Sequence, residues 1–139
     1  MNIIQKAYQF ASTVHQNEFR RDNVTPYMEH VIKVADIVTA RGGGENEIVT
    51  AILHDTLESG ATVEQLIEQG FSQEVIDAVK LLTLDKDKSY MENIRFLKTN
   101  EIARSVKIAD NLANLSDSPT DKQIFKYAKS LKILMEEKL

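Results

Sequence analysis

Four polar side chains interrupt the apolar faces of otherwise amphipathic segments. His30, His54, Asp55 and Asp110 each lie three or four residues from apolar neighbours, at positions where a helix would turn them inward. An unpaired buried carboxylate loses several kcal/mol of hydration, so each aspartate needs a partner. Two imidazoles and two carboxylates form a mixed nitrogen and oxygen set for a divalent cation. The alternative is that each is a separately hydrogen-bonded core residue.

The donor types also favour particular metals. The chain contains no cysteine, which excludes thiolate zinc sites, disulfides and cysteine nucleophiles. Structural zinc sites usually contain cysteine or more histidine than is present here. Two carboxylates therefore favour Mn²⁺, Mg²⁺ or Fe²⁺, with Zn²⁺ as a further alternative.

The elements that must position these side chains are predicted to be helices. Only two prolines and five glycines interrupt the chain, and no stretch alternates with period two for long enough to indicate a sheet. Thr62 with Gln65 is typical of a capping box, and Ser118 with Pro119 is expected to open the last helix. The expected helices begin near Ile3, Pro26, Glu45, Thr62, Ser72, Met91, Ile102 and Ser118. The pattern predicts an all-α bundle, with residues 1–139 as one domain.

Composition limits the classes of partner. The chain has 139 residues, 17 Lys plus Arg and 21 Asp plus Glu, for a net charge of −4. This balance argues against a nucleic-acid polymer as partner but leaves a small anionic substrate open. No apolar run approaches a membrane span, and the N-terminal segment lacks the form of a secretory signal, so we expect a cytoplasmic protein. The oligomeric state has no signal in the sequence.

Four stretches of the chain carry a resemblance to a known family. They are Arg20-Arg21-Asp22 with the TPYMEH of residues 25–30, the AILHDTLE of residues 51–58, Leu82-Thr83, and the VKIADNLANL of residues 106–115. In their order and spacing they resemble the HD superfamily of metal-dependent phosphohydrolases. Within it, the chain is similar to the RelA/SpoT-type (p)ppGpp hydrolase domains and their small single-domain relatives.

The resemblance implies a fold, a cofactor and a reaction. It implies an HD-domain helical bundle around a single metal site, usually Mn²⁺, with His30, His54, Asp55 and Asp110 as ligands. These are the same four residues that the burial argument selects. The implied substrate is a small phosphorylated nucleotide, (p)ppGpp, from which the 3′-pyrophosphate is removed to give GDP or GTP. A metal ion suits this hydrolysis because it activates water and neutralises phosphoryl charge.

The resemblance also implies roles for residues around the metal. Glu58 matches a glutamate that takes part in catalysis, and its place four residues after His54 predicts that both lie on one helix face. Arg20, Arg21 and Asn114 match residues that contact the nucleotide. The chain departs from the family at Ser59, where the family has an aspartate after the glutamate. Serine can hydrogen-bond a water molecule but is no base near neutral pH.

Ser59 motivates two alternatives to the alarmone hydrolase. The chain could hydrolyse a different phosphorylated nucleotide, or it could bind a nucleotide or metal as a sensor without turnover. A metal-free helical bundle is the third alternative, and it would leave all four polar residues with structural roles only.

Overall fold

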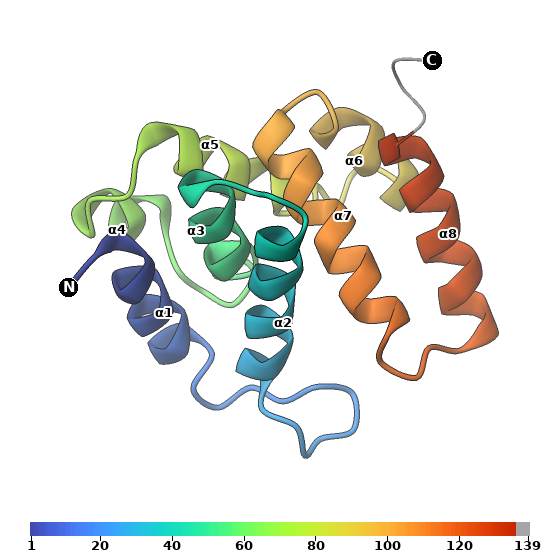
Figure 1. The fold of residues 1–139 in the computed structure, drawn as a ribbon, viewed down its shortest axis with the longest axis horizontal. Helices are drawn as coiled ribbons and strands as arrows, with labels where there is room; N and C mark the ends of the chain where they lie inside the picture. Colours follow the sequence, from blue (N-terminus) through green and yellow to red (C-terminus); the bar gives the residue numbers. More distant parts are fainter. Residues whose placement is uncertain (136–139) are drawn as a thin grey trace.

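A computed structural model describes residues 1–135 as a bundle of eight helices (Figure 1). The helices are α1 (Ile3–Val14), α2 (Tyr27–Ala40), α3 (Glu45–Leu53), α4 (Val63–Glu68), α5 (Gln73–Leu82), α6 (Tyr90–Leu97), α7 (Glu101–Leu115) and α8 (Asp121–Met135). Within residues 1–135 the only β-type pairing is an isolated bridge between Phe19 and Pro26. The predicted all-α architecture is confirmed. In the same part of the chain, none of the helices combines the length and hydropathy that a bilayer span requires.

Side-chain caps fix several helix starts. Thr62 and Gln65 form the predicted capping box, in which the Gln65 backbone N–H donates to Thr62 Oγ1 and the Thr62 N–H donates to Gln65 Oε1. Ser72 caps α5 through the backbone N–H of Val75, as its position predicts. These bonds satisfy donors that the first helical turn leaves without partners.

The start of the last helix differs from the prediction. The helix α8 begins at Asp121, and Thr120 and Gln123 make the reciprocal bonds of its start. Ser118 instead adopts a φ of 45°. A residue that precedes proline is disfavoured in the right-handed helical region, so Ser118 belongs to the turn before the helix.

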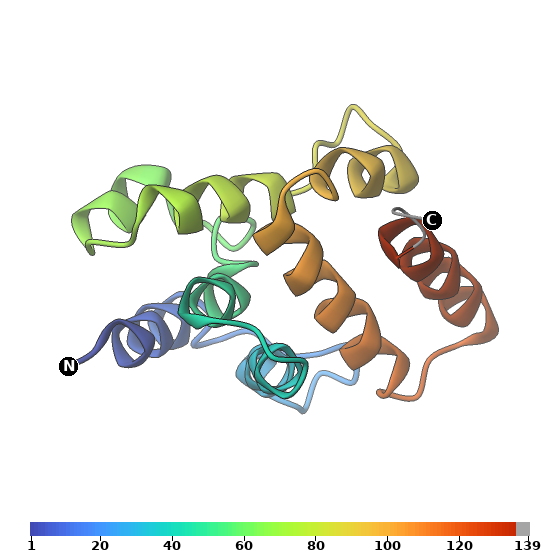
Figure 2. The same cartoon turned by 45° about the horizontal axis from the view of Figure 1, so that its top comes forward.

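Helix α7 lies at the centre of the bundle. It packs against α2, α3, α5 and α8, and in Figure 1 it runs between α2 and α8. Figure 2 shows α5 and α6 following one another along the side of the bundle opposite α2. A polar residue on the inward face of α7 is therefore surrounded by several other helices.

Helix α3 ends earlier than the spacing of its polar residues suggested. Its last residue is Leu53, and His54 is the C-cap. The backbone N–H and hydroxyl of Thr56 both donate to the Leu53 carbonyl, at 3.0 and 2.7 Å, which closes the helix with a tight turn. The prediction that Glu58 follows His54 on one helix face was wrong, because Glu58 lies in the turns after the helix.

The buried face of α3 gives a direct stability test. Ile52 is 0% exposed, whereas Ile67 on α4 is 56% exposed. We expect Ile52→Ala to lower the free energy of unfolding by about 2–5 kcal/mol, because it removes buried methyl groups and leaves a cavity. The matched variant Ile67→Ala should change it by less than about 0.5 kcal/mol. Urea unfolding measures both, and equal losses would contradict this packing.

Candidate metal centre

Three polar side chains from different helices meet inside the bundle. His30 from α2, His54 at the end of α3 and Asp110 from α7 each offer a ligand atom, and these atoms lie within 4.8 Å of one another. All three side chains are buried. The structure thus brings together three of the four residues that the sequence selects, in a group that could hold a divalent metal ion.

Asp110 is held by partners on both of its oxygens. Its Oδ1 lies 2.8 Å from His30 Nε2, and its Oδ2 accepts a hydrogen bond from Lys107 Nζ at 3.1 Å. Burial alone would raise the pKa of Asp110, but the Lys107 charge, the bond from His30 and the charge of nearby His54 hold that pKa well below its usual value. The carboxylate is therefore ionised in the interior, as a metal ligand must be.

His54 has one ring nitrogen in use and one without a hydrogen-bond partner. Its Nδ1 lies 2.6 Å from the carbonyl oxygen of Ala51, so Nδ1 is the donor and carries a hydrogen. Its Nε2 lies 3.1 Å from Asp55 Oδ2 and 3.7 Å from Asp110 Oδ1, yet it is buried without a hydrogen bond among the described residues.

This orphaned nitrogen fits a cation. In a neutral ring the Nε2 lone pair would face two carboxylates, which is unfavourable unless a proton or a metal ion lies between them. Burial lowers the pKa of His54, but the Asp55 and Asp110 carboxylates outweigh this effect and hold it well above its usual value. The site therefore attracts positive charge at the position that a metal ion would take.

Asp55, the fourth predicted residue, lies at the edge of this cluster. It is not in the group of three, but its Oδ2 approaches His54 Nε2 and accepts a hydrogen bond from the Tyr27 hydroxyl. Although burial raises the pKa of Asp55, the charge of His54 and the hydrogen bond from Tyr27 lower that pKa to about 2. The role of the Tyr27 hydroxyl was not predicted, although the place of Tyr27 one turn before His30 on α2 was a usable signal.

Glu58 and Ser59 occupy the turns that follow His54. Glu58 Oε1 accepts a hydrogen bond from the Leu84 backbone N–H at 3.4 Å. Partial burial and the negative charge of Asp55 raise the pKa of Glu58. Ser59 Oγ donates to Glu18 Oε1 at 2.9 Å, a partner that the sequence analysis missed because the two residues are 41 positions apart.

The three residues expected to contact a nucleotide also converge. Arg20 Nη2 donates to Asn114 Oδ1 at 3.0 Å, and Arg21 Nη2 donates to the Asp117 carbonyl oxygen at 3.3 Å. Asn114 Nδ2 in turn lies 3.4 Å from Asp110 Oδ1, so this group adjoins the metal centre. Asp117, which also pairs with Arg20 at 3.3 Å, was not predicted from the sequence and lies just beyond the end of α7.

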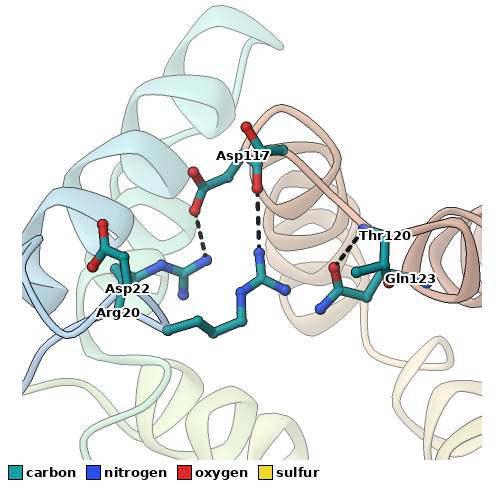
Figure 3. A pocket seen from close by; sticks show the side chains of 7 residues that line it. Arg20, Asp22, Asp117, Thr120 and Gln123 are labelled. Atoms are coloured by element: carbon teal, nitrogen blue, oxygen red, sulfur yellow. Dashed lines mark hydrogen bonds and ion pairs between the residues drawn. The ribbon is translucent and has the colours of Figure 1, made fainter.

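Two hollows open beside these arginines. The first, of about 360 Å³, is seen in Figure 3, where dashed lines join the arginine side chains to Asp117. The second, of about 280 Å³, includes both Arg20 and His30 in its lining. Arg20 thus lies between an open polar hollow and the edge of the buried cluster.

Comparisons with known proteins show the family to which the chain belongs. Residues 7–129 match the family model described as HD domain. The guanosine-3′,5′-bis(diphosphate) 3′-pyrophosphohydrolase MESH1 of Xenopus tropicalis is 37% identical over 123 residues, covering 83% of this chain and 69% of the relative. The human protein of the same name is 35% identical over 120 residues, covering 81% of this chain and 67% of the relative.

More distant relatives are longer. A probable GTP pyrophosphokinase of Mycobacterium leprae is 29% identical over 147 residues, covering 96% of this chain, which corresponds to 18% of that protein.

Among solved structures, a metazoan ortholog of SpoT that hydrolyses ppGpp and plays a role in starvation responses superimposes with a TM-score of 0.78. It is 28% identical, and the match covers 97% of this chain and 86% of that one.

The family match spans most of the chain, and the Xenopus relative exceeds 30% identity while the chain covers more than two thirds of it. This chain therefore belongs to the HD domain family.

Proposed function

We propose that this protein is a divalent-metal-dependent phosphohydrolase that removes the 3′-pyrophosphate of (p)ppGpp to give GDP or GTP and pyrophosphate. The observation that carries the proposal is the buried group of His30, His54 and Asp110 in an HD domain. The two relatives above are named for this reaction, which supports its transfer to the present chain.

The proposed metal ligands are His30, His54, Asp55 and Asp110. Mn²⁺ is the proposed ion, with Mg²⁺, Fe²⁺ and Zn²⁺ as alternatives, because the donors are two imidazoles and two carboxylates. A bound ion would supply a water of lowered pKa and neutralise charge on the phosphoryl oxygens. Lys107 and Tyr27 hold the two aspartates in place through their hydrogen bonds.

Residues around the proposed ion would handle the proton and the nucleotide. Glu58 would position the attacking water and take up its proton, and its raised pKa makes the carboxylate a better acceptor. Arg20 and Arg21 would bind phosphate oxygens or stack on the base. Asn114 would contact the nucleotide from α7, where it already bonds Arg20. Substrate phosphates would then replace Asp117 as the partner of Arg20.

The proposal also covers the domain organisation, the partner and the location of the enzyme. The family match over residues 7–129 supports a single HD phosphohydrolase domain for residues 1–139. The proposed partner is a small phosphorylated nucleotide, and a cytoplasmic location follows from the nucleotide pool to which the substrate and products belong.

Turnover of ppGpp tests the function. We expect the purified chain, stripped of metal and supplied with Mn²⁺, to release GDP and pyrophosphate in equal amounts, and we expect a chelator to abolish the release. Chromatography of the nucleotides and an assay for pyrophosphate measure both products. Orthophosphate in place of pyrophosphate, or no GDP from a chain shown to contain metal, would contradict the proposal.

The role of Arg20 gives a second prediction. We expect Arg20→Lys to raise KM for ppGpp about tenfold with little change in kcat, since lysine keeps the charge but loses the planar fork. Metal content should not change. The matched control is Arg95→Lys on the exposed side of α6. Steady-state kinetics measure KM and kcat for both variants. An unchanged KM in Arg20→Lys would contradict a role for Arg20 in nucleotide binding.

A further inference from the structure

Ser59 is paired with a carboxylate from a distant loop. Its hydroxyl donates to Glu18 Oε1 at 2.9 Å, and His15 Nδ1 lies 3.2 Å from the same oxygen. The His15 side chain is fully buried, whereas Glu18 keeps 37% of its side chain exposed. Two donors thus fix the direction of the Glu18 carboxylate.

The pairing changes what Ser59 can do. A hydroxyl has one hydrogen to donate and two lone pairs to accept with. Because Ser59 gives its hydrogen to Glu18, its oxygen can only accept a hydrogen bond from a third group. An acceptor oxygen backed by a negative charge is what an aspartate would present at this position.

Both members of the pair are tied to the metal centre. The Ser59 backbone N–H donates to the Asp55 carbonyl oxygen at 3.2 Å. On the other side, the Tyr27 backbone N–H donates to the Glu18 carbonyl oxygen at 2.9 Å, and the Tyr27 hydroxyl binds Asp55. The His15 and Tyr27 rings are also in contact, with centroids 4.9 Å apart. The pair is therefore built against the residues that surround Asp55.

We propose that Glu18 and Ser59 together replace the second acidic residue of the site. Glu18 is a positioning residue that supplies the negative charge, and it holds Ser59 Oγ as an acceptor toward the attacking water. This inference rests on the proposed hydrolysis of ppGpp. It explains how a chain with serine at position 59 keeps a second anionic group, the Glu18 carboxylate, bonded to the residue that follows Glu58.

The variant Glu18→Gln separates charge from structure. The amide oxygen can still accept the Ser59 hydrogen bond, so a residue that only tethers the loop would be replaced without effect. We expect kcat for ppGpp to fall at least about tenfold, with KM and bound Mn²⁺ unchanged. The matched control is Glu68→Gln, an exposed residue at the end of α4, which should retain wild-type kcat.

The exchanged variant provides a rescue. Adding Ser59→Asp to Glu18→Gln returns one carboxylate to the pair, and we expect kcat to recover to within about threefold of wild type. Ser59→Asp alone, with Glu18 retained, places two like charges together and should be slower than the exchanged variant. If Glu18→Gln does not fold, Ser59→Ala still tests the pair, because it retains Glu18 and should lower kcat by at least about tenfold.

The outcomes separate the two proposals. An active wild type with an equally active Glu18→Gln, or an exchanged variant no faster than Glu18→Gln, would overturn the pairing while the proposed function stands. Ser59→Ala with wild-type kcat would overturn it as well. A metal-loaded wild type that releases no pyrophosphate from ppGpp would remove the proposed function and the pairing with it.

Discussion

Asp110 holds an ionised carboxylate in the middle of the bundle, where the neighbouring helices must supply its partners. A charge taken out of water is tolerated only with close partners, and removal of one partner of a buried pair typically costs about 3–5 kcal/mol. His30 at 2.8 Å and Lys107 at 3.1 Å provide those partners. His30 comes from α2 and Lys107 from α7. The packing of these two helices therefore determines whether the carboxylate has its partners.

A second layer of polar contacts surrounds this carboxylate. Tyr27 holds Asp55, the Ala51 carbonyl fixes the tautomer of His54, and Asn114 links Asp110 to Arg20. Hydrogen bonds of this kind orient ligands and set their protonation. The same layer connects the buried cluster to the open hollow beside the arginines. A ligand that binds the arginines therefore lies next to the place where a metal ion would be held.

Much of the fold and site follows from local sequence signals. Helical spacing and capping residues such as Thr62 predict the helices, and inward polar positions predict His30, His54 and Asp110. Local signals did not predict where two of the helices begin or end. Pro119 kept Ser118 out of α8, and the bonds of Thr56 to Leu53 ended α3 before Glu58.

The contacts that remained hidden join distant parts of the chain. Glu18 lies in a polar loop and would be interpreted as a solvated charge from sequence alone, yet the fold brings it to Ser59. Asp117 meets Arg20 only because the loop before α2 folds back against the end of α7. Such pairs depend on how helices are arranged, which periodicity within one helix does not specify.

We expect the buried cluster of His30, His54 and Asp110 to bind one divalent ion. The most direct test is the number of ions retained per chain after the metal-free protein is loaded with Mn²⁺ and dialysed. Elemental analysis should find about one ion in the wild type and in Asp77→Asn, a control on the exposed face of α5. It should find almost none in Asp110→Asn, with helix content checked by circular dichroism. A wild type without bound ion, or an Asp110→Asn variant that retains it, would contradict the account.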